Sequence, residues 1–353
     1  MLRAASISLA VAIVLLSAGC SKSGKDSQAQ LNVYMYSEYI APELPEQFEA
    51  QTGIHARIDV YEATEEMMAK LQRAGGASQY DVVVVSDHAI PVLVHLGLLQ
   101  HLDPGRIPNH RNISEQFRHA PYDPWDRYSV PYQWGTVGLM YRRDKIPHME
   151  PTWAFLFDTT RQAGAFVLID SMRDMMGVAL KYSGHSVNSR NTDELRSAGE
   201  AILKAKKSSN CLGFEGGVGG KNKVLARMAA MAVVYSGDAI RAMDEDKDVG
   251  FVLPREGSII WVDAMTIPAR APNLDGAHKF INFILDAQVG ALLSNFNRYA
   301  TPNAASLPLI NPQDRANPAI YPPAEQVRTL EYLEDLGEAT RLYDEIWTAV
   351  KSR

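Results

Sequence analysis

The sequence predicts an α/β protein with two lobes, and three observations support this fold class. The chain has 353 residues, 46% hydrophobic and 22% charged, which is enough for more than one buried core. From residue 31 onward, short apolar runs alternate with amphipathic helical segments, as in α/β folds. The segment YDVVVVS at 80–86 contains four consecutive valines, which is typical of a parallel strand covered on both faces.

The periodicity of the apolar residues predicts the elements in chain order. Strands are expected at 31–36, 54–61, 80–86, 166–170, 232–235 and 259–262. Helices are expected at 41–52, 64–74, 192–207, 224–231, 275–295 and 324–350, and another passes through Met175 and Leu180 to Tyr182. Residues 103–134 are rich in proline and aromatic side chains, so we expect a loop that leads into a short strand.

The N-terminus carries the pattern of a secretory signal peptide, which we assign to residues 1–19. Arg3 is followed by an uncharged apolar stretch that ends in Leu16-Ser-Ala-Gly-Cys20. The apolar run of about 15 residues is shorter than the roughly 20 that cross a bilayer. Its last five residues resemble the bacterial lipoprotein signal, which implies that Cys20 is acylated. Residues 20–30 are small and polar, and they predict a flexible tether behind this lipid.

Composition and motifs argue against several functional classes. The formal net charge of −6 gives no broad attraction to nucleic acid, and two cysteines, one of them Cys20, exclude a disulfide scaffold. The nine histidines follow no metal-ligand spacing. The glycine-rich segment 213–222 lacks the first glycine and the Ser/Thr of a phosphate-binding loop, and no nucleophile motif is present. We therefore expect no metal, no cofactor and no catalysis.

A set of short segments places aromatic rings beside carboxylates. They are YSEY at 36–39, DSMRD at 170–174, YSGD at 235–238, WVD at 261–263 and RYATPN at 298–303. A ring face attracts a cation, and a neighbouring carboxylate pairs with an ammonium group. Polyamines carry protonated amines at the ends of an aliphatic chain and match such a site. Taken alone, a Tyr or Trp is more often a core or rim residue and an Asp is more often a helix cap, so the argument rests on the segments together.

In order and spacing, these segments resemble the bacterial spermidine/putrescine-binding family, the extracytoplasmic solute receptors of polyamine ABC importers. The similarity runs from about residue 31 to the C-terminus and is most specific at 36–39, 51–54 (QTGI), 80–86, 129–138 (SVPYQWGTVG), 261–268 (WVDAMTIP) and 299–303. The resemblance implies a two-lobed periplasmic-binding-protein fold of type II character, with the ligand in a hinged cleft. The first lobe would contain 31–137 and 262–305, and the second 138–261 and 306–353.

The resemblance also implies which side chains hold the ligand. Aromatic walls would come from Tyr36, Tyr39, Tyr235, Trp261 and Tyr299, and polar contacts from Ser37 and Ser86. The acids would be Glu38, Asp174, Asp238 and Asp263. Of these, Asp238 matches an acid of the putrescine-specific branch, and Asp263 matches the acid that anchors an amine deep in the cleft.

Some positions depart from the family's pattern. Tyr36 and Tyr235 occupy positions where well-known members have tryptophan, and Ser171 occupies one where a spermidine-binding member has aspartate. His88 replaces a tyrosine, and Leu333 replaces a polar contact. These changes remove hydrogen-bonding groups along a long triamine and favour putrescine over spermidine. The sequence does not show whether Arg173 and Arg298 face the cleft.

The expected function is a lipid-anchored periplasmic or otherwise extracytoplasmic receptor that delivers putrescine to an ABC permease, monomeric on family grounds. Two alternatives keep the fold: a polyamine-sensing subunit of a membrane signalling protein, or a receptor for another small cation such as agmatine. An enzyme that uses Glu38 and Asp263 as an acid/base pair is disfavoured, because no nucleophile, metal set or cofactor motif accompanies them.

Overall fold

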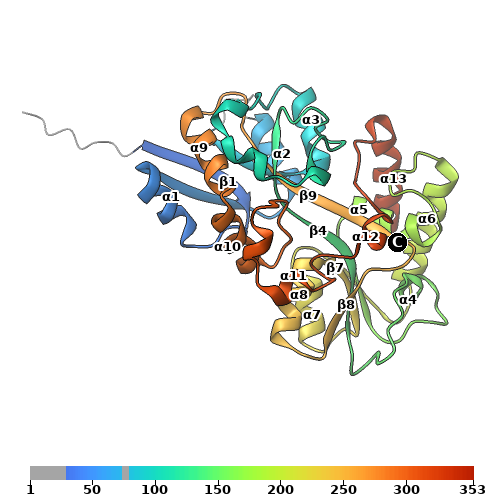
Figure 1. The fold of residues 1–353 in the computed structure, drawn as a ribbon. Coiled ribbons are helices and arrows are strands. Elements are labelled where there is room, and N and C mark those ends of the chain that lie inside the picture. The colour runs from blue at the N-terminus through green and yellow to red at the C-terminus, as the bar shows by residue number, and fades with distance from the viewer. Residues whose placement is uncertain (1–28, 74–78) are drawn as a thin grey trace, which may run out of the picture.

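The structure is a computed structural model that describes residues 29–73 and 79–353, and it has the predicted two-lobed α/β fold (Figure 1). The expected signal peptide, Cys20 and most of the expected tether lie outside the described residues. Ala29 and Gln30, which we expected in the tether, are the first two residues of a strand. In the described part of the chain, no helix combines the length and the apolar character needed to cross a membrane.

The first lobe is built on three parallel strands in the order β2-β1-β3. They are β1 (Ala29–Tyr36), β2 (Ile54–Tyr61) and β3 (Val82–Ser86), close to the predicted ranges. Its helices are α1 (Leu44–Thr52), α2 (Thr64–Arg73), α3 (Ile90–His95), α9 (Leu274–Ile284) and α10 (Ala287–Asn297). Because parallel strands end at the same edge of a sheet, the last residues of β1 and β3, Tyr36 and Ser86, lie at one edge.

The second lobe carries β7 (Met231–Tyr235), β5 (Phe166–Ile169) and β6 (Cys211–Glu215) in that spatial order, with β8 (Val249–Val252) paired to β4. Its helices are α4 (Ala154–Phe157), α5 (Met172–Tyr182), α6 (Thr192–Lys206), α7 (Gly219–Leu225), α8 (Ser236–Glu245) and α13 (Thr340–Ser352). The segment between α10 and α13 holds α11 (Pro312–Arg315), α12 (Ala324–Val327) and β10 (Leu330–Glu331). Short 3-10 helices occupy Asp87–Ala89, Pro104–Arg106, Pro108–Asn112, Glu115–Phe117, Leu307–Leu309 and Gly337–Ala339.

Two long strands, β4 (Ser129–Arg142) and β9 (Ser258–Thr266), run from one lobe into the other (Figure 1). The first half of β4 pairs antiparallel with β9, and its second half pairs with β7 and β8 of the second lobe. β9 also pairs with β3 of the first lobe. The prediction of a short strand near residue 134 was wrong, because this strand has 14 residues and is buried along almost its whole length.

Other predicted elements also needed correction. The helix expected at 224–231 is the end of α7 followed by the start of β7, and the one expected at 275–295 breaks before Asp286, which caps α10. The helix expected at 324–350 is mostly non-helical until Thr340. β6, α8 and β8 were not predicted. Short apolar runs suit a strand or a buried helix turn equally well, so periodicity could not separate them.

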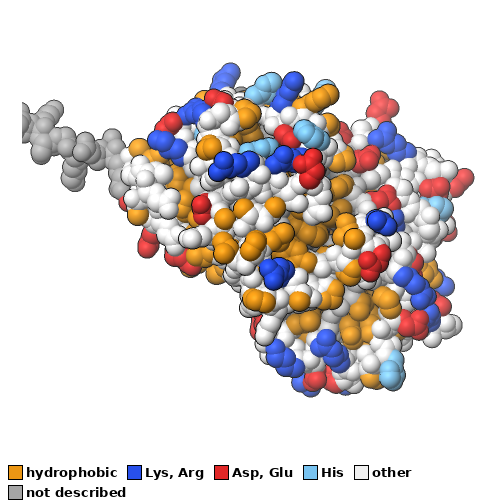
Figure 2. Space-filling view, in the orientation of Figure 1, with side chains coloured by type: hydrophobic (Ala, Val, Ile, Leu, Met, Phe, Trp, Pro, Cys, Tyr) orange, Lys and Arg blue, Asp and Glu red, His pale blue; other side chains and the backbone are white. Residues whose placement is uncertain are grey.

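Separate buried hydrophobic clusters form the cores of the two lobes. Val33, Val84 and Phe280 belong to the first cluster, and Leu168 and Tyr343 to the second. The predicted lobe boundaries stay a prediction, but Ala319 and Ile320, which we assigned to the second lobe, pack in the first core. Figure 2 shows hydrophobic side chains gathered on the viewed face where the two lobes meet.

Candidate ligand-binding site

Asp263 lies on the crossing strand β9, paired in register with Ser86 at the end of β3 and with Gln133 of β4. Its side chain is 3% exposed, and two hydroxyl groups of the first lobe donate to it. Tyr39 Oη is 2.5 Å from Oδ2, and Ser86 Oγ is 2.8 Å from Oδ1. No ion pair to Asp263 is formed by the described residues. Burial raises the pKa of this carboxyl to about 6 from an ordinary value of 3.8.

Tyr36 and Tyr39 form the aromatic side of this end of the site, with ring centroids 5.1 Å apart. The Tyr36 hydroxyl lies 2.6 Å from Thr64 Oγ1 and 2.9 Å from Ser86 Oγ. Burial and the charge of Asp263 raise the pKa of both tyrosines, so they stay protonated hydroxyls at neutral pH. Ser37 comes directly after Tyr36, one residue beyond the end of β1, and is half-buried.

Aromatic rings connect the two lobes in a chain of edge-to-face contacts. Tyr39 lies 6.0 Å from Tyr299, Tyr299 5.1 Å from Trp261, and Trp261 6.0 Å from Tyr235, between ring centroids. Two glycines make room for the rings: a Cβ on Gly237 would lie 2.2 Å from the Tyr299 ring, and one on Gly135 would lie 2.5 Å from the Trp261 ring. Within the described chain, the buried indole Nε1 of Trp261 has no hydrogen-bond partner.

Asp174 brings a second buried carboxyl to the site from the first turn of α5 in the second lobe. It is 6% exposed, and the hydroxyl of Tyr235 donates to its Oδ2 at 2.8 Å. Burial raises its pKa, while the contacts with Ser171 and Tyr235 act against this shift. Like Asp263, it forms no ion pair with the described residues. Ser171, a predicted departure, is the N-cap residue of α5 and accepts from the Asp174 amide.

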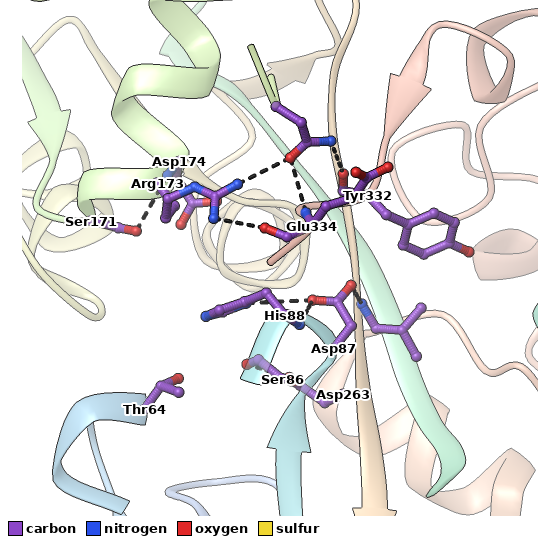
Figure 3. A network of polar contacts seen from close by, with 12 residues as sticks. Thr64, Ser86, Asp87, His88, Ser171, Arg173, Asp174, Asp263, Tyr332 and Glu334 are labelled. Carbon is purple, nitrogen blue, oxygen red and sulfur yellow. Dashed lines mark hydrogen bonds and ion pairs between the residues drawn. The ribbon is translucent and has the colours of Figure 1, made fainter. Parts of the chain in front are cut away.

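Asp87 and His88 lie between these two carboxyl groups (Figure 3). Asp87 is 1% exposed and accepts from the backbone amides of Val262, at 3.0 Å, and of His88, at 2.7 Å. His88 Nδ1 is 3.5 Å from Asp87 Oδ1, and the imidazole is 30% exposed. Sequence reasoning missed Asp87, although an acid directly after the valine-rich strand could have drawn attention to it. The predicted departure His88 does lie in the site.

The guanidinium of Arg173, also shown in Figure 3, is hydrogen-bonded within the second lobe. It donates to the Glu334 carbonyl at 2.9 Å and to Asn188 Oδ1 at 3.0 Å. Arg298 forms ion pairs with Asp314 at 2.7 Å and with Asp244 at 3.0 Å.

The acids Asp238 and Glu38 have a cation of their own, which the sequence analysis did not anticipate. Arg241 of α8 contacts Asp238 Oδ1 at 2.6 Å and Glu38 Oε2 at 3.8 Å. Its guanidinium also lies 5.9 Å from the centroid of the Tyr299 ring. Asp238 is buried, which raises its pKa, and Arg241 opposes that shift. Glu38 is 69% exposed, so it is an outer residue of the site.

Leu333 is buried and lines a cavity of about 370 Å³ between the lobes, together with Tyr122, Tyr332 and Glu334. Among the residues that the structure describes, no group of His, Cys, Asp and Glu has the arrangement of a metal site. The predicted residues that meet directly at the junction are Tyr36, Tyr39, Ser86, Asp174, Tyr235, Trp261, Asp263 and Tyr299.

Two α/β lobes joined by crossing strands, with rings and buried acids of both lobes at the junction, define a binding protein of the two-lobed class. The chain belongs to the family of bacterial extracellular solute-binding proteins, whose model matches residues 43–322.

The resemblance to spermidine/putrescine-binding proteins is confirmed by comparison with individual relatives. The spermidine/putrescine-binding periplasmic protein of Escherichia coli is 30% identical over 338 residues, 96% of each chain. The putrescine/cadaverine-binding protein of Pseudomonas aeruginosa is 32% identical over 354 residues, covering 97% of this chain and 98% of that protein. The solved spermidine/putrescine ABC transporter substrate-binding protein of Streptococcus pneumoniae superposes with a TM-score of 0.82, at 28% identity, covering 92% of this chain and 99% of that one.

Proposed function

We propose that this protein is a receptor that captures putrescine between its lobes and delivers it to an ABC importer. The observation that carries the proposal is the pair Asp263 and Asp174, two buried carboxyl groups that form no ion pair with the described residues. A buried carboxylate is costly unless a positive charge accompanies it. The two ammonium groups of a diamine supply the missing charges, and the rings between them cover its methylenes.

The charges around the junction favour a doubly charged ligand. The charge of Asp87 acts on both Asp174 and Asp263, and Arg173 is a cation whose charge interacts with those of Asp87 and Asp174. Three carboxylates against one guanidinium leave two negative charges when His88 is neutral. A diamine therefore neutralises these groups, whereas a triamine would leave one positive charge in excess. The buried Leu333 also offers that third amine no hydrogen bond.

Binding involves no chemical step in this proposal. A ligand held by Asp263 alone contacts one lobe's hydroxyl groups, and closure adds Asp174, Tyr235 and the remaining rings. The closed form is stabilised because only it contacts both ends of the diamine. Closure would then present the receptor to the permease, and the acyl chain on Cys20 would keep the monomeric receptor at the extracytoplasmic face of the membrane. Mass spectrometry of the mature N-terminus tests the acylation.

Thermal unfolding with a ligand panel tests the proposed ligand. The protein is unfolded and refolded to remove bound ligand, then heated with putrescine, cadaverine, spermidine, agmatine, arginine or divalent metals. At about 100 times the dissociation constant, linkage stabilises the folded state by roughly 2.7 kcal/mol. We expect the largest shift with putrescine and a smaller one with spermidine. A shift with none of the amines would refute the proposal, and a larger shift with spermidine would refute the preference for a diamine.

A further inference from the structure

His88 occupies a position in the site that the proposed function does not use. Figure 3 shows its ring between Asp174 of the second lobe and Ser86 and Asp263 of the first. The charge of Asp174 acts on His88, and that of His88 acts on both Asp174 and Asp263, so the imidazole is close to both acids. The ring is partly accessible, and Nδ1 faces Asp87, whose carboxylate is held by the Val262 and His88 amides.

We propose that His88 makes this site selective for a dication: neutral His88 accepts a hydrogen bond from a ligand ammonium, and protonated His88 takes the place of one. The inference rests on the proposed function and adds to it the residue that sets ligand charge. With Nδ1 toward Asp87, the neutral imidazole presents Nε2 as an acceptor. The imidazolium instead presents a second N–H and a positive charge, which repels an ammonium group.

The charged groups packed around His88 decide how its proton responds to a ligand. They are Asp87 beside it, Asp174 and Arg173 from α5, and Asp263 from β9. Burial lowers the pKa of His88, the Asp87 contact and the charge of Asp174 raise it, and the net result is a raised pKa. Two ammonium groups between the same acids would cancel that attraction. Diamine capture should therefore release the His88 proton, and its affinity should fall as pH decreases through the His88 titration.

A ligand with one ammonium group responds differently to protonation of His88. Protonated His88 lowers the net charge of the ligand-free site from two negative charges to one, and a single ammonium group neutralises that remaining charge. The ligand 4-amino-1-butanol has nearly the length of putrescine but a hydroxyl at one end. Both ligands place an ammonium on Asp263, so protonation of Asp263 weakens both of them. The ratio of the two affinities therefore isolates the second charge, which is the one that His88 replaces.

Calorimetry of the ligand-free full chain with both ligands, across a pH series, tests the inference. We expect the putrescine preference to fall by up to about tenfold for each pH unit below the His88 midpoint. In His88→Gln the preference should lose the part of this fall that His88 causes, so it should change less with pH than in the wild type. The matched control is His95→Gln, an exposed histidine at the end of α3, which should keep the wild-type trend.

Histidine-ring NMR of the unaltered protein gives a second readout that does not depend on a variant folding. The His88 resonance should titrate above the ordinary midpoint without ligand and at lower pH with saturating putrescine. A His88 midpoint that putrescine leaves in place, or a preference constant with pH in the wild type, overturns the inference while the receptor function stands. Absence of putrescine binding at every pH overturns the proposed function itself.

Discussion

The buried carboxylates at the two ends of the site, Asp263 and Asp238, differ in whether the protein supplies a positive charge beside them. At the Asp263 end, two neutral hydroxyl groups donate to a buried carboxylate. At the Asp238 end, an equally buried carboxylate is paired with Arg241 at 2.6 Å. The family resemblance placed both acids among the ligand-binding residues. The difference teaches that a buried carboxylate indicates a cationic ligand when the protein supplies no cation, and an internal ion pair when it does.

The largest effect should come from Asp263→Ala. Removing this carboxylate leaves a desolvated ammonium without a partner, which costs about 3 to 5 kcal/mol in buried pairs and weakens binding by more than roughly a hundredfold. Calorimetry with putrescine measures the loss. The comparison control is Asp275→Ala, an exposed acid on α9 that should bind normally. An affinity within about tenfold of the wild-type value would show that Asp263 does not bind the ligand ammonium.

Asp263→Asn should stabilise the ligand-free protein while it abolishes putrescine binding. The folded pKa is raised from 3.8 to about 6, so the folded state favours the neutral carboxyl. This stabilisation is complete below the unfolded pKa and is lost as pH rises through about 6. The neutral amide of the asparagine variant retains this stabilisation at higher pH, so the free energy of unfolding of the variant should exceed that of the wild type by up to about 3 kcal/mol.

Urea unfolding at about pH 5 and about pH 8 measures this difference. The gain of the asparagine variant should be larger at the higher pH. A variant that is less stable than wild type by the same amount at both values would show that the charged form of Asp263 is not penalised in the ligand-free protein.

Asp174→Asn should have an intermediate effect that depends on the ligand. Loss of a charged hydrogen-bond acceptor costs about 1.5 to 3 kcal/mol, so putrescine affinity should fall roughly tenfold to a hundredfold. Affinity for 1-aminobutane, whose single ammonium needs Asp263 alone, should change much less. Competition between the two ligands in calorimetry gives both values from one preparation. Equal losses for both would mean that Asp174 acts on the fold and not on the second amine.

The smallest effect on affinity should come from Asp238→Asn. Its charge is already neutralised by Arg241, and Arg241 keeps Glu38 as a partner in the variant. Putrescine affinity should change by less than about threefold, although thermal stability falls because a buried ion pair is broken. If the folded variant lost as much binding as Asp263→Ala, the second amine would be bound at Asp238. The proposed difference between the Asp263 and Asp238 ends of the site would then be wrong.

Much of the fold could be predicted because its signals are local. The ranges of β1, β2 and β3 follow the apolar runs closely, and the resemblance pointed to two lobes around a hinged cleft. The length of β4 and the break before α10 could not be predicted, because a strand buried between two lobes and a mid-helix cap depend on distant partners. Asp87 was missed for the same reason, because the Val262 amide that donates to it lies far away in the sequence. Arg241 was missed because helix α8, which places it one turn from Asp238, was not predicted.

The sequence by itself determined the alternation of strands and helices, the family, and the residue types that suit a polyamine, since periodicity and motifs are properties of neighbouring residues. Only the tertiary structure decided which acids have a cation. Asp238 is separated from Arg241 by one helical turn, which orients the pair, whereas Asp263 meets Tyr39 and Ser86 from segments more than a hundred residues away. The electrostatic state of a buried group depends on such contacts in space, so it follows from the fold and not from the order of residues.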